Sequence, residues 1–336
     1  MVFSLYRENP GQNGGKTLPD VIPYLERWRN RWGLLMAYVP PYIALHERGE
    51  LTTRIRSLNE ILVECRLCPR RCGVNRLQEE LGYCRAGSQL MISSVFPHFG
   101  EEAPLVGYRG SGTIFLTHCN LRCVFCQNYD ISHLGRGEKT SSSQMASYMM
   151  RLQELGCHNI NFVTPTHYVP QIVASLPQAI ELGLQLPLVY NCSGYESLEV
   201  IKLLDGVIDI YMPDAKYAGE EPAKQFSNAP DYPTVLKEVL KEMHRQVGDL
   251  HMDENGIANR GLLIRHLVMP GNLGGTGDLM KFIAEELSPA SYVNVMQQYR
   301  PEYKSRDYPE LSRRITYGEY LDAVKTARRF GLHRGF

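Results

Sequence analysis

The chain has 336 residues, with 36 lysine and arginine side chains balanced by 36 aspartate and glutamate side chains, so its formal net charge is zero. This length suits one large α/β barrel or two ordinary domains. Balanced charge argues against a surface devoted to nucleic acid or to an anionic membrane, because such surfaces carry a basic excess. The longest apolar stretch, 33–45, contains Pro40 and Pro41 and is too short to cross a bilayer.

The N-terminal third is expected to differ from the rest of the chain. Residues 1–15 lack the apolar segment of a signal peptide, which indicates a cytoplasmic protein. Residues 1–20 have an irregular pattern, and residues 21–64 have a helical one with breaks at Pro40–Pro41 and Gly49. We therefore expect an N-terminal helical extension over 1–64, followed by a loop region rich in cysteine, glycine and proline over 65–110.

Seven of the nine cysteines fall into two clusters, which is typical of metal ligands in a chain without a signal peptide. The first cluster is Cys65, Cys68, Cys72 and Cys84, and it opens with a C-x2-C spacing. Four such ligands meet the requirement of a closed site, either structural zinc or an iron–sulfur cluster. The alternative is four unrelated thiols, and the lone Cys157 is expected to be such a buried core thiol.

From residue 111 onward, short β-branched runs alternate with helical patterns. The runs that predict buried parallel strands are 112–119, 159–166, 186–194, 207–216, 261–271 and 292–299. The segments that predict helices are 142–156, 169–183, 196–206, 232–248, 277–288 and 317–331. Six strand–helix units with right-handed crossovers predict an α/β fold, a partial (β/α)6 TIM-type barrel over 111–336. An open six-stranded Rossmann-like sheet is the alternative.

The helix ends carry residues that commonly stop or start a helix. Ser141–Ser143 and Ser193 occupy positions where N-caps are expected, and Gly156, Gly183 and Gly331 occupy positions where helices end.

The second cysteine cluster, Cys119, Cys123 and Cys126, follows the first predicted strand of the barrel. It therefore lies at the carboxyl edge of the sheet, where α/β barrels place their chemistry. Three thiolates on a cubane cluster leave one iron free to bind a chelating group. The alternative is a zinc loop completed by a distant cysteine or histidine.

The C-x3-C-x2-C spacing, with Phe125 before the third cysteine, resembles the signature of the radical S-adenosylmethionine (SAM) superfamily, and the resemblance extends from about residue 110 to 300. It implies a [4Fe–4S] cluster on Cys119, Cys123 and Cys126, with SAM bound to the open iron. It also implies reductive cleavage of SAM to methionine and a 5′-deoxyadenosyl radical. A flavodoxin- or ferredoxin-type protein is the expected one-electron reductant.

Three later segments, 191–195, 209–216 and 265–271, resemble in order those of the pyruvate formate-lyase activating enzymes. The resemblance implies that Lys216 holds the methionine carboxylate of SAM and that Asp214 orients its ribose or sulfonium end. A surface ion pair is the alternative for these two side chains. Contacts to ribose or adenine are expected from Asn191, Ser193 and Tyr195, although Ser193 also suits a simple turn.

Arg265 and His266 follow each other on the fifth predicted strand. The resemblance makes Arg265 a cofactor-binding residue, and as a charge within a sheet it must find a partner in any case. His266 points to the opposite face, and we expect a satisfied core or helix-facing histidine.

The sequence departs from the activating enzymes after the second strand. A Gly-Gly-Glu there normally binds the methionine amino group, but this chain has "VTPTHY" and no carboxylate. Thr164, Thr166 or His167 would then supply the acceptor. The cysteine motif at 65–84 instead resembles that of a little-understood group of radical SAM proteins related to the activating enzymes.

We expect an enzyme that abstracts a hydrogen atom from a backbone glycine of a partner protein, in the manner of the activating enzymes. The alternatives are a radical SAM enzyme that modifies a peptide or small molecule, and a non-catalytic iron–sulfur electron carrier. A carrier is disfavoured because it protects its cluster with four ligands, whereas this loop offers three. No segment of the sequence identifies the substrate.

Overall fold

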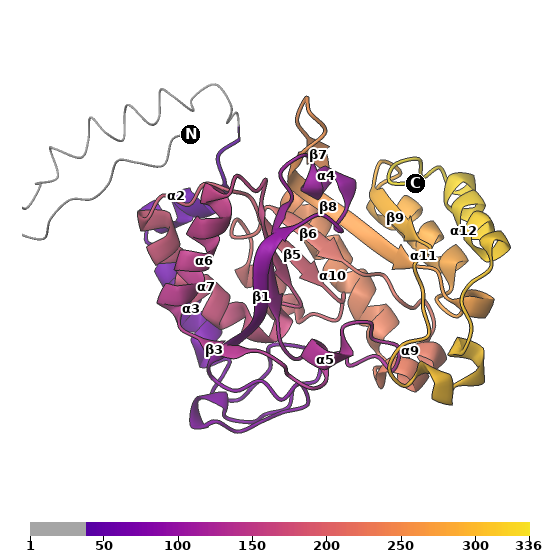
Figure 1. Ribbon diagram of the computed structural model, residues 1–336, viewed down its shortest axis with the longest axis horizontal. Coiled ribbons are helices and arrows are strands. Elements are labelled where there is room, and N and C mark those ends of the chain that lie inside the picture. Colours follow the sequence, from indigo (N-terminus) through magenta and orange to yellow (C-terminus); the bar gives the residue numbers. More distant parts are fainter. Residues whose placement is uncertain (1–37) are drawn as a thin grey trace, which may run out of the picture. The chain divides into compact units, whose positions relative to one another are not determined.

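The structure is a computed structural model that describes residues 38–336, and the chain divides into two compact units, Met1–Val39 and Pro40–Phe336. The fold is that of the second unit (Figure 1). The irregular segment expected at 1–20 and the helical pattern at 21–37 lie outside the described residues. The three-part division of the chain therefore stays a prediction.

A parallel sheet in the order β2-β4-β5-β6-β8-β9 forms the centre of the fold. Its strands are β2 (Ser111–Leu116), β4 (Ile160–Val163), β5 (Leu188–Cys192), β6 (Ile210–Pro213), β8 (Ala258–Leu267) and β9 (Tyr292–Met296). Each of the six overlaps a strand expected from its β-branched run. Two-residue β7 (His251–Met252) pairs antiparallel with β8.

Helices connect these strands and cover one face of the sheet (Figure 1). The expected ones are α6 (Ser142–Glu154), α7 (Val169–Glu181), α8 (Leu198–Leu203), α10 (Tyr232–Val247), α11 (Thr276–Phe282), which a π-helix (Ile283–Leu287) continues, and α12 (Tyr317–Arg329). Short α5 (Tyr129–Ser132) and α9 (Glu220–Ser227) were not expected. The predicted α/β fold, with six strand–helix units and a mostly parallel sheet, is confirmed and is consistent with a partial TIM-type barrel.

Most of the residues expected to start or stop a helix do so in the structure. Ser141 caps α6 through a capping box with Gln144, and Gly156, Gly183 and Gly331 have φ angles of 84°, 100° and 86° just beyond three helices. Such positive φ angles favour glycine because it has no Cβ.

The N-cap expected at Ser193 is wrong. Helix α8 begins later, after Ser197, and Ser193 lies in the buried turn that follows β5. The turn continues as far as Ser197 because Tyr195 and Glu196 are themselves buried against the core rather than placed on a helix.

The expected breaks in the N-terminal helical pattern are confirmed within the described residues. Helix α2 (Pro41–Glu47) begins at Pro41, and α3 (Glu50–Glu60) begins after Gly49, whose φ is 71°.

The loop region expected at 65–110 contains an unexpected strand, β1 (Leu90–His98). It pairs antiparallel with β2 and with β3 (Glu138–Thr140), so it extends the sheet beyond the six parallel strands. Strand β1 has no regular apolar alternation and contains Pro97, which argues against a strand from sequence alone. Helix α4 (Ala103–Val106) follows it.

The two faces of the sheet bury different residues. Ile114, Phe162 and Tyr190 belong to the large core that includes the helices. On the other face, Leu105 of α4 packs with apolar side chains from β5, β6 and β8 in a smaller core: Val189, Ile210, Met212 and Leu263. Helix α4 therefore covers the inner face towards the amino ends of the strands and leaves their carboxyl ends to polar side chains.

No helix in the described part of the chain is long and apolar enough to cross a membrane.

Candidate metal and cofactor site

The three-cysteine loop leaves the carboxyl end of β2 and turns sharply. His118 and Arg122 have φ angles of 67° and 56°, in the left-handed region that non-glycine residues seldom adopt. The His118 N–H donates to the Ile131 carbonyl over 2.9 Å, and the Val124 N–H donates to the Phe226 carbonyl over 2.9 Å. The loop conformation is thus held by the residues around it.

Each of the three sulfurs has a hydrogen-bonding neighbour. Ser227 donates to Cys123 Sγ over 3.1 Å, Ser132 Oγ lies 3.1 Å from Cys126 Sγ, and the Leu121 N–H donates to Cys119 Sγ over 3.4 Å. Hydrogen bonds to sulfur are one of the features by which proteins tune iron–sulfur clusters.

Burial raises the pKa of the Cys119 thiol to about 11 and also raises the pKa of Cys123 and Cys126. The charge of Lys216 opposes this rise at all three thiols, so Lys216 lies within electrostatic reach of the whole loop. Buried thiols beside a fixed cation suit thiolates bound to a metal centre. The donor set therefore fits a cluster.

Phe125 belongs to this loop and is buried, with only 5% of its surface exposed. Its ring centroid is 5.9 Å from that of Tyr299 and 6.4 Å from that of Tyr217. It anchors the third cysteine to the core.

Four of the expected site residues meet at the carboxyl ends of β5, β6 and β8. Lys216 Nζ donates to Asp214 Oδ2 over 2.5 Å, and Arg265 Nε donates to Asp214 Oδ1 over 2.7 Å. Arg265 Nη2 also donates to Asn191 Oδ1 over 2.8 Å. Although burial alone would raise the pKa of Asp214, the charges of Arg265 and Lys216 keep that pKa below its usual value. Asp214 and Lys216 are thus a largely buried ion pair, each side chain 14% exposed, rather than a surface pair.

Two carboxylates that the sequence analysis missed join this group. Glu101 and Glu102 precede α4, and their carboxylate oxygens lie 3.7 and 4.0 Å from Arg265 Nη1. Asn294 of β9 donates a hydrogen bond to Glu102. Burial raises the pKa of Glu102. Their only signal in the sequence is a pair of adjacent glutamates before a proline, which does not place them inside a barrel.

The three residues expected to replace the missing carboxylate form hydrogen bonds with different partners. Thr166 donates to Glu196 Oε1 over 2.9 Å, and His167 Nε2 lies 2.7 Å from the Thr117 carbonyl. Burial lowers the pKa of His167 to about 3. Thr164 is half-buried, with a φ of 61°, and its N–H donates to the Asn191 carbonyl over 2.8 Å. It is therefore the one of the three linked to the charged group.

Glu196 is a further residue that the sequence analysis missed. It is 2% exposed and accepts hydrogen bonds from Thr166 and from the Tyr190 hydroxyl, each over 2.9 Å. Burial raises the pKa of Glu196 to about 7.

Ser193 and Tyr195 follow β5 in the turn before α8. The Ser193 hydroxyl is buried, and within the described residues it has no hydrogen-bond partner. The Tyr195 hydroxyl donates to Asp231 Oδ1 over 2.6 Å. His266 is helix-facing as expected, because its ring nitrogens lie 2.8 Å from the Ala215 carbonyl and 2.9 Å from the hydroxyl of Thr276 in α11.

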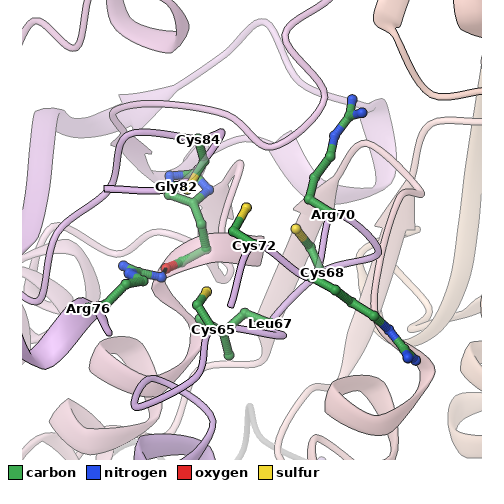
Figure 2. Close-up of a pocket in the computed structure, with 10 residues that line it drawn as sticks. Cys65, Leu67, Cys68, Arg70, Cys72, Arg76, Gly82 and Cys84 are labelled. Carbon is green, nitrogen blue, oxygen red and sulfur yellow. Dashed lines mark hydrogen bonds between the residues drawn. The ribbon is translucent and has the colours of Figure 1, made fainter. Parts of the chain in front are cut away.

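The other cysteine cluster lines a pocket of about 320 Å³, open mouth included. Figure 2 shows Cys65, Cys68, Cys72 and Cys84 around this space, with Arg76 beside them. Arg70 reaches from this segment to the three-cysteine loop, where its Nε donates to the Asn120 carbonyl over 3.1 Å. The lone Cys157 is 3% exposed in the core, as expected.

Comparison with known proteins identifies the class that this fold and site define. Residues 113–283 match the radical SAM superfamily, and the chain belongs to it. Membership implies an enzyme with a [4Fe–4S] cluster, SAM and a one-electron reductant of flavodoxin or ferredoxin type.

Two known proteins are similar to this chain. An uncharacterized protein of Methanocaldococcus jannaschii is 35% identical over 293 residues, which cover 84% of this chain and 79% of that protein. A crystal structure of a radical SAM methyltransferase from Sphaerobacter thermophilus is 13% identical, with a TM-score of 0.44. That match covers 66% of this chain and 65% of the methyltransferase, slightly less than two thirds of its length.

Proposed function

We propose that Cys119, Cys123 and Cys126 hold the [4Fe–4S] cluster and that SAM binds beside it at the carboxyl edge of the sheet. The observation that carries this proposal is that the three cysteines follow β2 in the same parallel sheet whose β5, β6 and β8 ends bring Asn191, Asp214 and Arg265 together. When bound, the cluster supplies the electron that cleaves SAM to methionine and a 5′-deoxyadenosyl radical.

The protein's own residues bind and orient SAM. Lys216 holds the methionine carboxylate, since Asp214 and Cys123 raise its pKa despite desolvation and keep it charged. Asp214, fixed by Arg265 and Lys216, accepts hydrogen bonds from the ribose or faces the sulfonium. Asn191 and Ser193 line the same edge, and Thr164 provides an acceptor near the amino group.

As the substrate we propose a glycine-containing segment of a partner protein, as in the activating enzymes. The three ordered segments at 191–195, 209–216 and 265–271 support this branch. A six-unit barrel is also less complete than an eight-unit one, so an extended peptide can approach the SAM site from the side. Holding a Cα–H near the radical supplies much of the rate through positioning. A cytoplasmic location belongs to the same proposal.

The first test is incubation of the reduced, reconstituted protein with SAM. We expect methionine and 5′-deoxyadenosine from the wild type and none from Cys119→Ala, Cys123→Ala or Cys126→Ala. The matched control is Cys157→Ala, a buried cysteine of neither cluster, which should retain cleavage. Circular dichroism should show that all four variants are folded. Cleavage by any of the three loop variants would disprove the ligand assignment.

The second test adds candidate partner proteins from the same cell. A glycyl doublet in the electron paramagnetic resonance spectrum of a partner would support the activating role. A modified small molecule would instead support a second candidate, radical modification of a small polar compound. That candidate is favoured by Glu101, Glu102 and Arg265, which place charges on the inner face of the sheet.

A further inference from the structure

We propose that Arg70, in the four-cysteine segment (residues 65–89), is a positioning residue for the cluster of the three-cysteine loop. It holds Ser227 where the serine hydroxyl donates to Cys123 Sγ, and it thereby raises the reduction potential of that cluster. This role rests on the proposed function, because it requires a cluster in the three-cysteine loop. It also goes beyond that function, since it gives a task to a segment outside the matched residues 113–283.

The guanidinium of Arg70 bonds two parts of the barrel at once. Its Nε donates over 3.1 Å to the carbonyl of Asn120, the residue directly after Cys119. Its Nη2 donates to the Ser227 carbonyl over 2.9 Å, and its Nη1 donates to the Asn228 carbonyl. A guanidinium presents its N–H groups in a rigid planar fork. The three bonds therefore hold the three-cysteine loop and the end of α9 in one arrangement.

Helix α9 offers these carbonyls because it ends at Ser227. Asn228 follows with a φ of 48°, in the left-handed region, and its N–H donates to the Lys224 carbonyl over 2.9 Å. The last carbonyls of a helix have no partner within it, and a cation beside them interacts favourably with the helix dipole. Arg70 therefore stabilises this helix end and fixes the position of Ser227.

Two aromatic rings fix the guanidinium itself. Arg70 Cζ lies 4.0 Å from the ring centroid of Tyr83 and 5.1 Å from that of Tyr195. Cation–π contacts of this kind stabilise arginine in one orientation. Tyr83 belongs to the four-cysteine segment and Tyr195 to the turn after β5, so both parts of the chain determine where Arg70 points.

The hydroxyl of Ser227 lies between a buried tyrosine and the three-cysteine loop. Ser227 is 2% exposed, and its Oγ lies 3.1 Å from Cys123 Sγ and 2.8 Å from the hydroxyl oxygen of Tyr217. A thiolate ligand carries no proton, so Ser227 is the donor to the sulfur. Because a serine hydroxyl has one hydrogen, Tyr217 must in turn donate to Ser227. The two bonds run in one direction, and each polarises the other.

The position of the last turn of α9 decides how well this donor reaches the sulfur. The Val124 N–H donates to the Phe226 carbonyl over 2.9 Å, so the neighbours of Cys123 and Ser227 are bonded as well. Hydrogen bonds to sulfur are among the features that set the potential of an iron–sulfur cluster. Such a bond stabilises the reduced cluster more than the oxidised one, because reduction adds a negative charge. Loss of the Ser227 bond should therefore make the cluster harder to reduce.

The test is a redox titration of the reconstituted full-length protein, followed by electron paramagnetic resonance at the cluster signal that changes when SAM is added. That signal separates the three-cysteine loop from any metal in the four-cysteine segment. In Ser227→Ala, the ratio of reduced to oxidised cluster at the wild-type midpoint potential should fall about three- to tenfold. A tenfold fall corresponds to about 59 mV for one electron. An unchanged midpoint would overturn the proposal.

Arg70→Lys separates positioning from charge. Lysine keeps the positive charge but lacks the planar fork, so the midpoint should fall by an amount comparable to that in Ser227→Ala. The double variant Arg70→Lys/Ser227→Ala should shift no further than Ser227→Ala alone, because both substitutions act through one hydrogen bond. A wild-type midpoint in Arg70→Lys, or shifts that add in the double variant, would overturn the proposal.

The matched control is Arg66→Lys, because Arg66 belongs to the same segment but pairs with the exposed carboxylate of Glu199. It should keep the wild-type midpoint, and a shift as large as that of Arg70→Lys would contradict a specific role of Arg70. Circular dichroism should show that all variants are folded. A wild type without any signal that responds to SAM would refute the proposed cluster site itself. A responsive signal without the expected shifts would refute only the role of Arg70.

Discussion

At the scale of single residues, three of the residues with strained backbone lie around the proposed SAM site. His118, Arg122 and Thr164 have φ angles of 67°, 56° and 61°, and Thr164 is β-branched, which makes such a value a genuine outlier. Each such residue costs on the order of 1–3 kcal/mol and persists only where the surroundings enforce it. Because these residues lie at the carboxyl ends of β2 and β4, the strain falls where cluster and cofactor must be positioned.

Replacing Lys216 by alanine tests the SAM contact directly. Loss of one charge-assisted hydrogen bond costs roughly 1.5–3 kcal/mol, so SAM affinity should fall about tenfold to hundredfold. Equilibrium binding to the reconstituted protein measures this change. Lys241→Ala is the matched control, because Lys241 also pairs with a carboxylate but lies exposed on α10. Unchanged affinity in Lys216→Ala would show that Lys216 does not contact SAM and serves only as the ion-pair partner of Asp214.

Glu196 should make stability depend on pH. Its folded pKa of about 7 lies above the ordinary value of 4.5, so folding favours the protonated form. Its contribution is complete below pH 4.5 and is lost as the pH rises through about 7. Relative to Glu196→Gln, the wild type should therefore lose on the order of 3 kcal/mol of unfolding free energy across this window.

Urea unfolding at a series of pH values measures the difference between wild type and Glu196→Gln. The control is Glu199→Gln, because Glu199 is a nearby but exposed carboxylate. Parallel pH profiles for wild type and Glu196→Gln would show that the buried carboxylate is not protonated on folding.

At the scale of elements, burial on both faces made the parallel strands predictable. Strands such as β5 and β6 are buried at every position, so their apolar runs are continuous. Strand β1 was not predicted because its sequence, LMISSVFPH, has neither a continuous apolar run nor an alternation of apolar and polar residues. Its extended conformation depends instead on its pairing with β2. Helix α9 escaped because it has only eight residues and contains Pro222.

The same distinction applies to the site. Asn191, Asp214 and Arg265 were predictable because each lies at the carboxyl end of a predicted strand, and such ends meet at one edge. Glu101 and Glu102 were not, because they belong to the connection between β1 and β2, whose course depends on α4 packing across the inner face. The position of these two glutamates therefore depends on a tertiary contact, the packing of α4, which the local sequence does not reveal.

Removing the metal from the four-cysteine segment should loosen that segment more than the barrel. Residues 65–89 contain no α-helix or long strand, so metal binding would supply much of their local folding free energy. In Cys65→Ser, amide hydrogen exchange should speed up about tenfold or more at 65–89, equivalent to about 1.4 kcal/mol, and stay unchanged in β4 and β5. Cys157→Ser is the control. Equal loosening of segment and barrel, or of neither, would contradict a locally structural metal.

At the scale of the whole second unit, Arg265 connects parts that are distant in the sequence. It bonds Asn191 of β5 and Asp214 after β6, and it faces Glu101 of the β1–β2 connection. Glu102 continues the link to Asn294 of β9. One guanidinium thus joins the middle of the sheet, its last strand and the connection that covers the inner face.

Replacing Arg265 by glutamine should therefore destabilise the whole barrel rather than one loop. The change leaves Asp214 and Glu101 buried with less compensating charge, and breaking a buried ion pair on one side costs about 3–5 kcal/mol. Chemical unfolding of the reconstituted protein measures the loss. The matched control is Arg313→Gln, whose ion pair with Glu319 is half-exposed and should matter little. Part of the loss should disappear at low pH, because protonated carboxyl groups no longer need the cation. A loss no larger than that of Arg313→Gln would mean that the carboxylates on the inner face are neutral or reached by water, and that α4 and the apolar core around Leu105 hold the connection in place without them.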